Sequence, residues 1–131
     1  MKNLLIPLFL FYSFMSYAQS FFVSGKDTRS NEHVEQKIKF EGYKIAVDSL
    51  KSDYTVQLLI DGEYNVVSFK RSYQGYIRII NSNTGLEVGR TKIIKRNPAV
   101  FNGYNASYDI FSIISKRYLA QELKKCITIH S

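Results

Sequence analysis

Side chains that could carry out acid–base or metal chemistry are few and far apart in this sequence. The chain contains two histidines, His33 and His130, and a single cysteine, Cys126. No group of His, Cys, Asp and Glu has the spacing of a metal site, and no glycine-rich phosphate loop occurs. Asp48 and Asp53 flank a loop and could form an acid–base pair, but roles as a loop cap and a turn residue explain them better. The sequence therefore predicts no catalytic residue, no cofactor and no metal, and favours a protein that is not an enzyme.

Positive charge is concentrated in one part of the chain. The sequence has 18 Lys and Arg against 11 Asp and Glu, which gives a formal net charge of +7. Residues 69–100 hold seven Lys and Arg and one acid, Glu87, so this segment alone carries seven minus one, or +6. Without Lys2, the rest of the chain is neutral overall. Basic and aromatic residues together suit an anionic partner, because Arg pairs with carboxylate or phosphate and Lys adds to the field.

A hairpin predicted in this segment carries the candidate binding site. If its turn is centred near Asn83, Arg78 on the first arm lies close to Arg90 and Lys92 on the second. Tyr76 then shares the face of Arg78. The predicted binding residues are Tyr76, Arg78, Arg90 and Lys92. Their expected partner is an envelope protein or an anionic surface, such as lipid headgroups or acidic polysaccharide; nucleic acid is not expected, because export separates the protein from it. The alternative is a solvated sheet face whose Lys and Arg deter edge pairing.

Periodicity in the first half of the chain predicts one helix among short strands. Residues 21–23 form an apolar run that fits an edge strand, and residues 30–41 fit a helix. Residues 43–47 are a strand candidate. Residues 54–60 are a better one, because apolar side chains alternate there with polar ones. Asp61 and Gly62 then indicate a tight turn.

The hairpin itself is the clearest β element. Residues 73–80 form its first arm, residues 81–85 its turn and residues 86–94 its return arm. Two possibilities remain for residues 64–70, which either lengthen the first arm, with Gly75 as a bulge, or form a loop.

A loop over residues 95–105 leads to a terminal amphipathic helix capped by Asn105. Asp109 lies in its first turn, residues 124–125 are basic and oppose the dipole at its end, and residues 127–129 fit a short closing strand. The apolar stripe expected to pack on the sheet is Ile110, Ile113, Ile114 and Tyr118. Helices at both ends of a run of strands predict an α+β fold, with an antiparallel or mixed sheet of about four to five strands and two helices packed on one face.

The first 18 residues have the pattern of a cleaved signal peptide. Lys2 supplies the positive charge, about twelve mostly apolar residues follow, and residues 16–18 place small residues where signal peptidase reads. The apolar run is shorter than a membrane span, which needs about 20 residues, so an uncleaved anchor is the alternative that fits less well. We therefore expect residues 19–131 to form a single α+β domain in the periplasm or outside the cell, with no transmembrane segment after cleavage. Position 19 is Gln, so the lipid-bearing Cys of a lipoprotein is not expected.

Several of these features together resemble a known class of domain. They are a helix, the stretch Ser52-Asp53-Tyr54 that opens a strand, the turn Asn83-Thr84-Gly85 and a closing amphipathic helix, spanning roughly residues 28 to 125. This arrangement resembles the small α+β domain of exported bacterial envelope proteins, such as the curli-secretion pore lipoprotein and the N-terminal domain of the Tol-system propeller protein. The resemblance implies action by protein contact and not by catalysis. The missing lipoprotein Cys departs from the pattern.

Three classes of function are compatible with these sequence features. The first is a non-catalytic exported interaction domain that uses its basic hairpin or an exposed sheet edge. The second is a small secreted hydrolase with an unrecognised site. The third is a self-assembling structural subunit that associates through Cys126 or its edges. Cys126 itself is expected to be a packed small hydrophobe, with pairing between molecules as the alternative.

Overall fold

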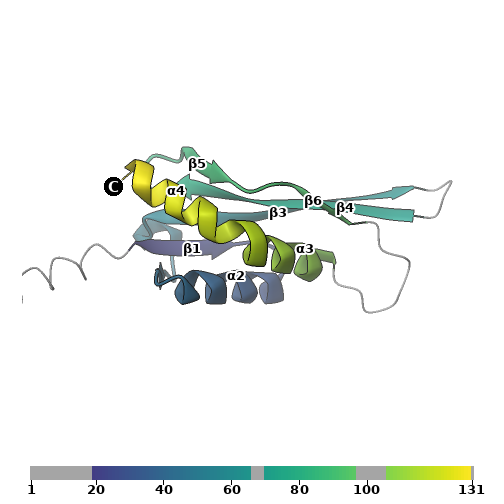
Figure 1. Cartoon of the computed structure of the whole chain (residues 1–131), viewed down its shortest axis with the longest axis horizontal. Helices are drawn as coiled ribbons and strands as arrows, with labels where there is room; N and C mark the ends of the chain where they lie inside the picture. The colour runs from purple at the N-terminus through teal and green to yellow at the C-terminus, as the bar shows by residue number, and fades with distance from the viewer. Residues whose placement is uncertain (1–18, 66–69, 97–105, 131) are drawn as a thin grey trace, which may run out of the picture.

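The computed structural model describes residues 19–65, 70–96 and 106–130 and shows one mixed β-sheet with helices on one face (Figure 1). In chain order the elements are β1 (Ser20–Ser24), α2 (Thr28–Phe40), β2 (Lys44–Ile45), the 3-10 turn η1 (Ser49–Lys51), β3 (Tyr54–Asn65), β4 (Lys70–Asn81), β5 (Glu87–Arg90), β6 (Ile94–Arg96), α3 (Ala106–Ile114), the π-helical turn η2 (Ser115–Leu119) and α4 (Ala120–His130). The predicted α+β class is confirmed.

The sheet has six strands and combines parallel and antiparallel pairs. Its order is β2-β1-β3-β4-β5, and β6 pairs with β4 farther along that strand. β1 is parallel to both β2 and β3, whereas β3, β4, β5 and β6 pair in antiparallel fashion. α3, η2 and α4 follow one another without a break, so they form one long helical rod beside α2 (Figure 1).

Local sequence explains the boundaries of α2. The Asp27 carboxylate accepts a hydrogen bond from the Ser30 backbone N–H, which satisfies a free donor of the first turn. Val34 and Ile38 lie one turn apart and are fully buried. Gly42 has a φ of +93°, the left-handed conformation that commonly ends a helix. The predicted helix at residues 30–41 is confirmed, and it begins two residues earlier.

The core lies between the inner face of the sheet and the helices. Alternate strand residues such as Phe21, Val56 and Ile77 are fully buried, and Ile110 and Ile114 meet them from the helical rod. Ile113 and Tyr118, expected in the same stripe, are half-buried. The other buried residues of the helical rod are Ala106, Phe111, Ser115, Leu119, Leu123 and Cys126.

Two predictions about β1 and β3 are wrong. The strand at residues 21–23 is not an edge strand, because β1 lies between β2 and β3. Asp61 and Gly62 do not turn the chain, because they continue β3 and pair with Gln74 and Tyr73 of β4. A Cβ at position 62 would lie 2.8 Å from the Tyr73 ring, so glycine serves close cross-strand packing here.

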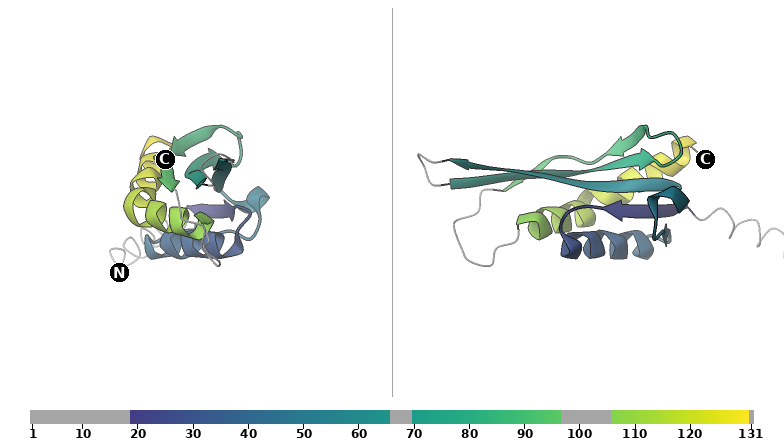
Figure 2. Two further views of the ribbon diagram at one scale, coloured as in Figure 1. Left: turned by 90° about the vertical axis from the view of Figure 1, so that its right-hand side faces the viewer. Right: turned by 180° about the vertical axis from the view of Figure 1, so that it is seen from behind.

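β3 and β4 therefore form a long hairpin that projects past the helices (Figure 2). Their register is continuous from Tyr54 opposite Asn81 to Asn65 opposite Lys70. Of the two alternatives for residues 64–70, the strand is therefore correct for residues 64, 65 and 70. Residues 66–69 lie outside the described part. Gly75 is not a bulge, because it pairs in register with Ile60. A Cβ on Gly75 would lie 2.8 Å from an Ile110 methyl group, so glycine allows the helical rod to approach the sheet.

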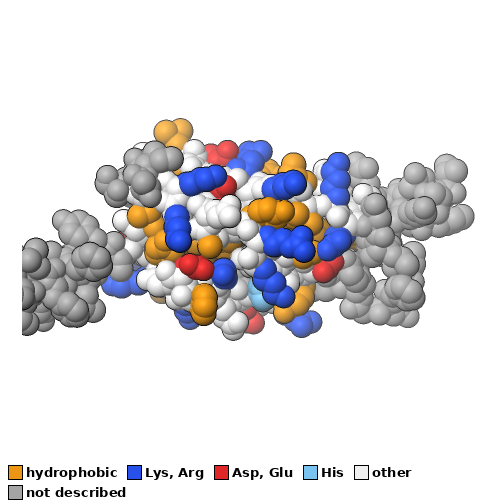
Figure 3. All heavy atoms as spheres, in the orientation of Figure 1, with side chains coloured by type: hydrophobic (Ala, Val, Ile, Leu, Met, Phe, Trp, Pro, Cys, Tyr) orange, Lys and Arg blue, Asp and Glu red, His pale blue; other side chains and the backbone are white. Residues whose placement is uncertain are grey.

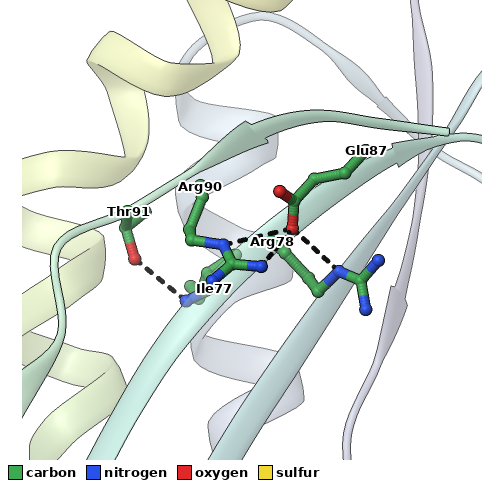
Figure 4. Close-up of polar contacts among 5 residues, drawn as sticks. All are labelled: Ile77, Arg78, Glu87, Arg90 and Thr91. Atoms are coloured by element: carbon green, nitrogen blue, oxygen red, sulfur yellow. Dashed lines mark hydrogen bonds and ion pairs between the residues drawn. The ribbon is translucent and has the colours of Figure 1, made fainter.

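The hairpin predicted at residues 73–94 begins with β4, and its return arm is split into β5 and β6. The register shifts beside Ile79 and Ile80, and the pairing stops after Arg90. Thr91 bridges the gap. Its N–H donates to the Ile77 carbonyl at 2.8 Å. Its Oγ1 accepts from the Ile77 N–H at 2.9 Å (Figure 4). A side chain thus replaces a missing link of the ladder.

The closing strand predicted at residues 127–129 is wrong, because α4 continues to His130. Leu119, Leu123 and Cys126 repeat at helical spacing and are all buried, and this tertiary packing overrides the local alternation. The basic residues 124–125 consequently lie inside the helix and not at its end. The cap expected at Asn105, most of the loop before it and the leader lie outside the described residues.

Candidate anion-binding face of the sheet

The face of the sheet opposite the helices is called the open face here. In both views of Figure 2 the described helices gather on one side of the sheet. Because side chains alternate along a strand, the residues between the buried ones point to the other side. Those residues are half-buried or exposed, and they include Phe22, Ser24, Thr55, Gln57, Leu59, Asp61, Gln74, Tyr76, Arg78, Ile80, Glu87 and Arg90.

Strand register aligns these residues in rows across the sheet. Gln57 lies opposite Arg78, and Arg78 lies opposite Arg90. In the neighbouring row Thr55 lies opposite Ile80, which in turn lies beside Glu87. Cross-strand neighbours on one face have Cβ atoms about 5 Å apart, so residues of the two rows can touch one ligand.

Arg78, Arg90 and Tyr76 gather around Glu87. One carboxylate oxygen, Oε1 of Glu87, accepts hydrogen bonds from Arg90 Nε at 3.2 Å and from Arg90 Nη2 at 2.9 Å (Figure 4). The same oxygen lies 3.0 Å from Arg78 Nε as an ion pair, although the Arg78 N–H is not aligned for a hydrogen bond. The Arg90 guanidinium also stacks 4.8 Å above the centre of the Tyr76 ring.

These contacts hold the arginines while leaving net positive charge. Glu87 raises the pKa of Arg90 through the hydrogen bonds, although partial desolvation opposes this, so Arg90 stays charged. One carboxylate neutralises only one of the two guanidinium groups. Figure 4 shows the two terminal nitrogens of Arg78 directed away from Glu87. The Arg78 side chain is 32% exposed, so these donors remain within reach of a ligand.

The structure brings together three of the four predicted binding residues. Tyr76, Arg78 and Arg90 share the open face, as expected from the hairpin. Lys92 is exposed, but it lies between β5 and β6, outside the register of both strands. The role of Glu87 as the common partner of both arginines was not predicted from the sequence; the signal for it was that Glu87 is the single acid of the segment.

Charge on the hairpin is divided between the two faces of the sheet. Lys95 pairs in register with Gln74, which is two residues from Tyr76 and therefore on the open face. Arg96 pairs with Tyr73 on the opposite face, where its Nε lies 3.3 Å from Asp109 of α3. Figure 3 shows further Lys and Arg side chains over the helical face, among fewer acidic ones. Positive charge alone therefore does not distinguish the open face from the helical face. The cluster of contacts around Glu87 distinguishes the open face.

Two shallow hollows flank this cluster. The first, of about 310 Å³, lies across β1, β3 and β4 and is lined by residues such as Phe22, Thr55 and Gln57. The second has a similar volume of about 310 Å³ and lies beside Leu59, Tyr76 and Ile93. The open face thus offers charged, polar and apolar contacts side by side.

The residues considered for acid–base chemistry have structural roles instead. Asp48 accepts a hydrogen bond from the Leu50 N–H and caps η1. Asp53 accepts from the backbone and the hydroxyl of Ser20, which fixes the start of β3 beside β1. The His33 ring packs edge-on against Tyr108. In the described part of the chain, no group of three or more His, Cys, Asp or Glu residues could hold a metal ion.

Cys126 is fully buried, as its expected role as a packed small residue requires. Its Sγ lies 3.7 Å from the Val88 carbonyl oxygen. A disulfide between molecules would require the helix to move away from β5.

Among the described residues, no helix is long and apolar enough to cross a membrane.

No family model matches the chain, and no curated protein matches it in sequence. Several solved structures resemble it. A variant of the PelC dodecamer from Paraburkholderia phytofirmans is 14% identical, with a TM-score of 0.48, over 80% of this chain and 88% of that one. A minor lipoprotein from Acinetobacter baumannii is 9% identical, with a TM-score of 0.49, over 80% and 91% of the two chains. Lipoprotein B from Nitrosomonas europaea is 11% identical, with a TM-score of 0.49, over 86% of both chains.

Two of these three neighbours are described as lipoproteins. At such low identities and TM-scores they carry no information on partner, ligand or activity. Any function must therefore be argued from the geometry of the site itself.

Proposed function

We propose that this protein is a non-catalytic, exported interaction domain that binds an anionic partner through the open face. The observation that carries the proposal is the cluster in which Arg78 and Arg90 share the single carboxylate of Glu87, with Tyr76 stacked on Arg90. The charge of one carboxylate balances the charge of one guanidinium group. The second guanidinium leaves the cluster one positive charge in excess, on the face of the sheet opposite α2 and the helical rod.

The geometry favours recognition of an anion over general solubility. Glu87 accepts two hydrogen bonds from Arg90, and the Tyr76 ring stacks against the Arg90 guanidinium. The Arg90 side chain therefore loses little conformational freedom when a ligand binds. Arg78 keeps its terminal nitrogens available for paired hydrogen bonds to a carboxylate or phosphate. Lys92 and Lys95 are exposed nearby in the chain and add to the attractive field.

The test compares the parent with a variant in which Arg78, Arg90 and Lys92 are all changed to Gln. A matched control changes Lys39, Lys116 and Arg117 to Gln, because these three are exposed on the helical elements and their loss alters net charge equally. We expect the first variant to lose recovery of the partner by crosslinking from native envelope extract, and the control to keep it. Added salt should reduce recovery by the parent, because exposed charges are screened over about 8 Å at physiological ionic strength.

Equal recovery by all three proteins, unaffected by salt, would overturn the proposal and favour contact through an uncharged sheet edge. One observation supports that second candidate. β1 pairs only with Tyr54–Gln57 of the twelve-residue β3, so β3 has no described partner on that side from Leu58 onward. An open edge of this kind can accept an added strand.

Export is part of the proposal and rests on the sequence pattern of residues 1–18. Cleavage after Ala18 gives a mature N-terminus at Gln19, where cyclisation to pyroglutamate is expected. Intact-mass measurement of the protein from the cell envelope and the medium tests this. A mass that still includes residues 1–18 would contradict it.

A further inference from the structure

The hollow across β1, β3 and β4, called the polar groove here, has a lining unlike that of the charged cluster beside it. Its walls include Phe22, Leu50, Thr55, Gln57, Ile80 and Ser82, and none of its lining residues carries a charge. Phe22 supplies an aromatic ring on the open face, whereas Thr55, Gln57 and Ser82 supply hydroxyl and amide groups. Its volume is about 310 Å³, and it is shallow.

Part of this polar lining is fixed by hydrogen bonds within the fold. The Ser82 hydroxyl lies 3.0 Å from Thr55 Oγ1 and 2.9 Å from Ser52 Oγ. Ser52 in turn donates to the Ser49 carbonyl at 2.9 Å. The hydroxyl groups at this end of the groove are thus held in place before any ligand arrives, which lowers the cost of binding.

Arg78 borders the polar groove. It is the cross-strand neighbour of Gln57, and it lies two residues before Ile80 on β4. Its terminal nitrogens point away from Glu87 (Figure 4). An anionic group held by Arg78 is therefore within about one residue spacing, near 5 Å, of the neutral groove.

We infer that the occupant of this surface is an acidic polysaccharide, with a sugar ring in the polar groove and its carboxylate on Arg78. This inference rests on the proposed function and names the class of its anionic partner. Sugar hydroxyls need hydrogen-bond partners. Because Ser52 donates to the Ser49 carbonyl, Ser82 donates to Ser52 and Thr55 donates to Ser82, so Thr55 Oγ1 offers an acceptor, and the Gln57 amide offers both a donor and an acceptor. The apolar C–H side of a pyranose ring packs against an aromatic ring such as Phe22. A uronate carboxylate matches the planar pair of Arg donors.

The lining of the groove favours this occupant over the other anionic partners. A phosphate headgroup needs cations and hydrogen-bond donors, but the hydroxyl protons of Ser52, Ser82 and Thr55 are already donated within the fold. An acidic protein segment presents few hydroxyl groups to the acceptors of the groove, whereas each sugar ring presents several. Charge at one side and neutral hydrogen bonding at the other fit a chain of sugars with one carboxylate per ring.

The probe is an oligogalacturonate of defined length, compared with the same oligosaccharide after methyl esterification, which removes the charge and keeps the rings. Binding is followed by amide chemical shifts and by calorimetry on residues 19–131. We expect the parent to bind the acid form and to bind the ester at least about tenfold more weakly, since the ester cannot form charge-assisted hydrogen bonds with Arg78. Shift changes should centre on Thr55, Gln57 and Arg78.

Variants separate the two halves of the site. Arg78→Gln should reduce affinity for the acid form at least about tenfold and leave the weak binding of the ester unchanged. Phe22→Leu should weaken both forms, because it removes the aromatic surface and keeps an apolar side chain. Lys39→Gln is the matched control on α2 and should change neither. Circular dichroism confirms that each variant is folded.

The outcomes distinguish this inference from the proposal on which it rests. If the parent binds no oligogalacturonate, but the triple Gln variant still loses the native partner, the polysaccharide is wrong and the anionic open face stands. Binding to phosphatidylglycerol vesicles that Arg78→Gln abolishes, without oligogalacturonate binding, would overturn the inference in favour of lipid. Equal binding of acid and ester, unaffected by Arg78→Gln, would also overturn it.

Discussion

Gly89 of β5 and Cys126 of α4 meet at a point where the sheet and the helix have no room for another atom. A Cβ at position 89 would lie 2.9 Å from Cys126 Sγ and 3.4 Å from a carboxylate oxygen of Glu122. Cys126 is fully buried there. Glycine at position 89 thus serves close packing, and it fixes how tightly β5, which carries Glu87 and Arg90, lies on the helical rod.

The first prediction concerns this contact. Gly89→Ala should destabilise the protein by about 1 to 3 kcal/mol, because it overpacks a site without space. In the double variant with Cys126→Ala the loss of Sγ provides room, so the combined cost should be smaller than the sum of the single costs. Urea unfolding of the parent, both single variants and the double variant measures this coupling. Strict additivity would show that the two residues do not press on each other.

The second prediction concerns the Cys126 thiol and pH. Burial raises the pKa of Cys126 to about 11, and the Glu122 carboxylate adds to the effect. A group with a raised folded pKa favours the folded state while it is protonated, so its contribution is present below about pH 9 and is lost as pH rises through about 11.

The stability advantage of the parent over Cys126→Ala should therefore shrink between about pH 9 and about pH 11. Tyr43, whose pKa is also raised by burial, is present in both proteins and cancels in the comparison. The pKa of Tyr54 is raised by burial and also by Cys126, so the comparison reports the thiol together with its coupling to Tyr54. Iodoacetamide should label the parent at neutral pH only when denaturant is added. Rapid labelling of the folded protein would show that the thiol is accessible and would contradict the buried position.

The third prediction tests the packing of the helical rod on the sheet. Ile114→Ala should cost about 2 to 5 kcal/mol, because Ile114 is fully buried among the core residues. Ile113→Ala is the control, since Ile113 is the neighbouring residue of the same type and is only half-buried, so its cost should be clearly smaller. Thermal unfolding that shifts equally for both variants would show that the rod is turned differently on the sheet.

Much of this fold could be predicted because local patterns agree with the final packing. The helix α2 has a capping Asp27 at its start, a buried pair one turn apart and a left-handed Gly42 after its end, and all three signals are local. Asp61-Gly62 led to a wrong prediction because the pair resembles a hairpin turn. The close approach of the Tyr73 ring explains the glycine, and that contact arises only once β4 is in place.

The candidate site was predicted to a similar degree and for similar reasons. Alternation along β4 and a turn near Asn83 bring Arg78 and Arg90 close together on one face, but the register shift beside Ile79 and Ile80 decides that they lie directly opposite each other. Lys92 was misplaced because Thr91 interrupts the return arm, and no local signal marks that break. The polar groove could not be predicted, since it needs the parallel pairing of β1 with β3, and strand order is a long-range property.

The last prediction concerns the break between β5 and β6, where Thr91 replaces a backbone partner. Its Oγ1 accepts the hydrogen bond of the Ile77 N–H at 2.9 Å, and Thr91 is 4% exposed. Thr91→Val keeps the shape of the side chain but leaves that buried N–H unpaired, so it should cost about 1 to 3 kcal/mol. Thr91→Ser keeps the hydroxyl group and loses only a methyl group, so the Ile77 amide should stay protected from hydrogen exchange in this control. In Thr91→Val that amide should exchange faster than its neighbours on β4, because its partner is gone. Unchanged protection of the Ile77 amide in Thr91→Val would mean that the N–H finds another acceptor, and that Thr91 does not hold the return arm against β4.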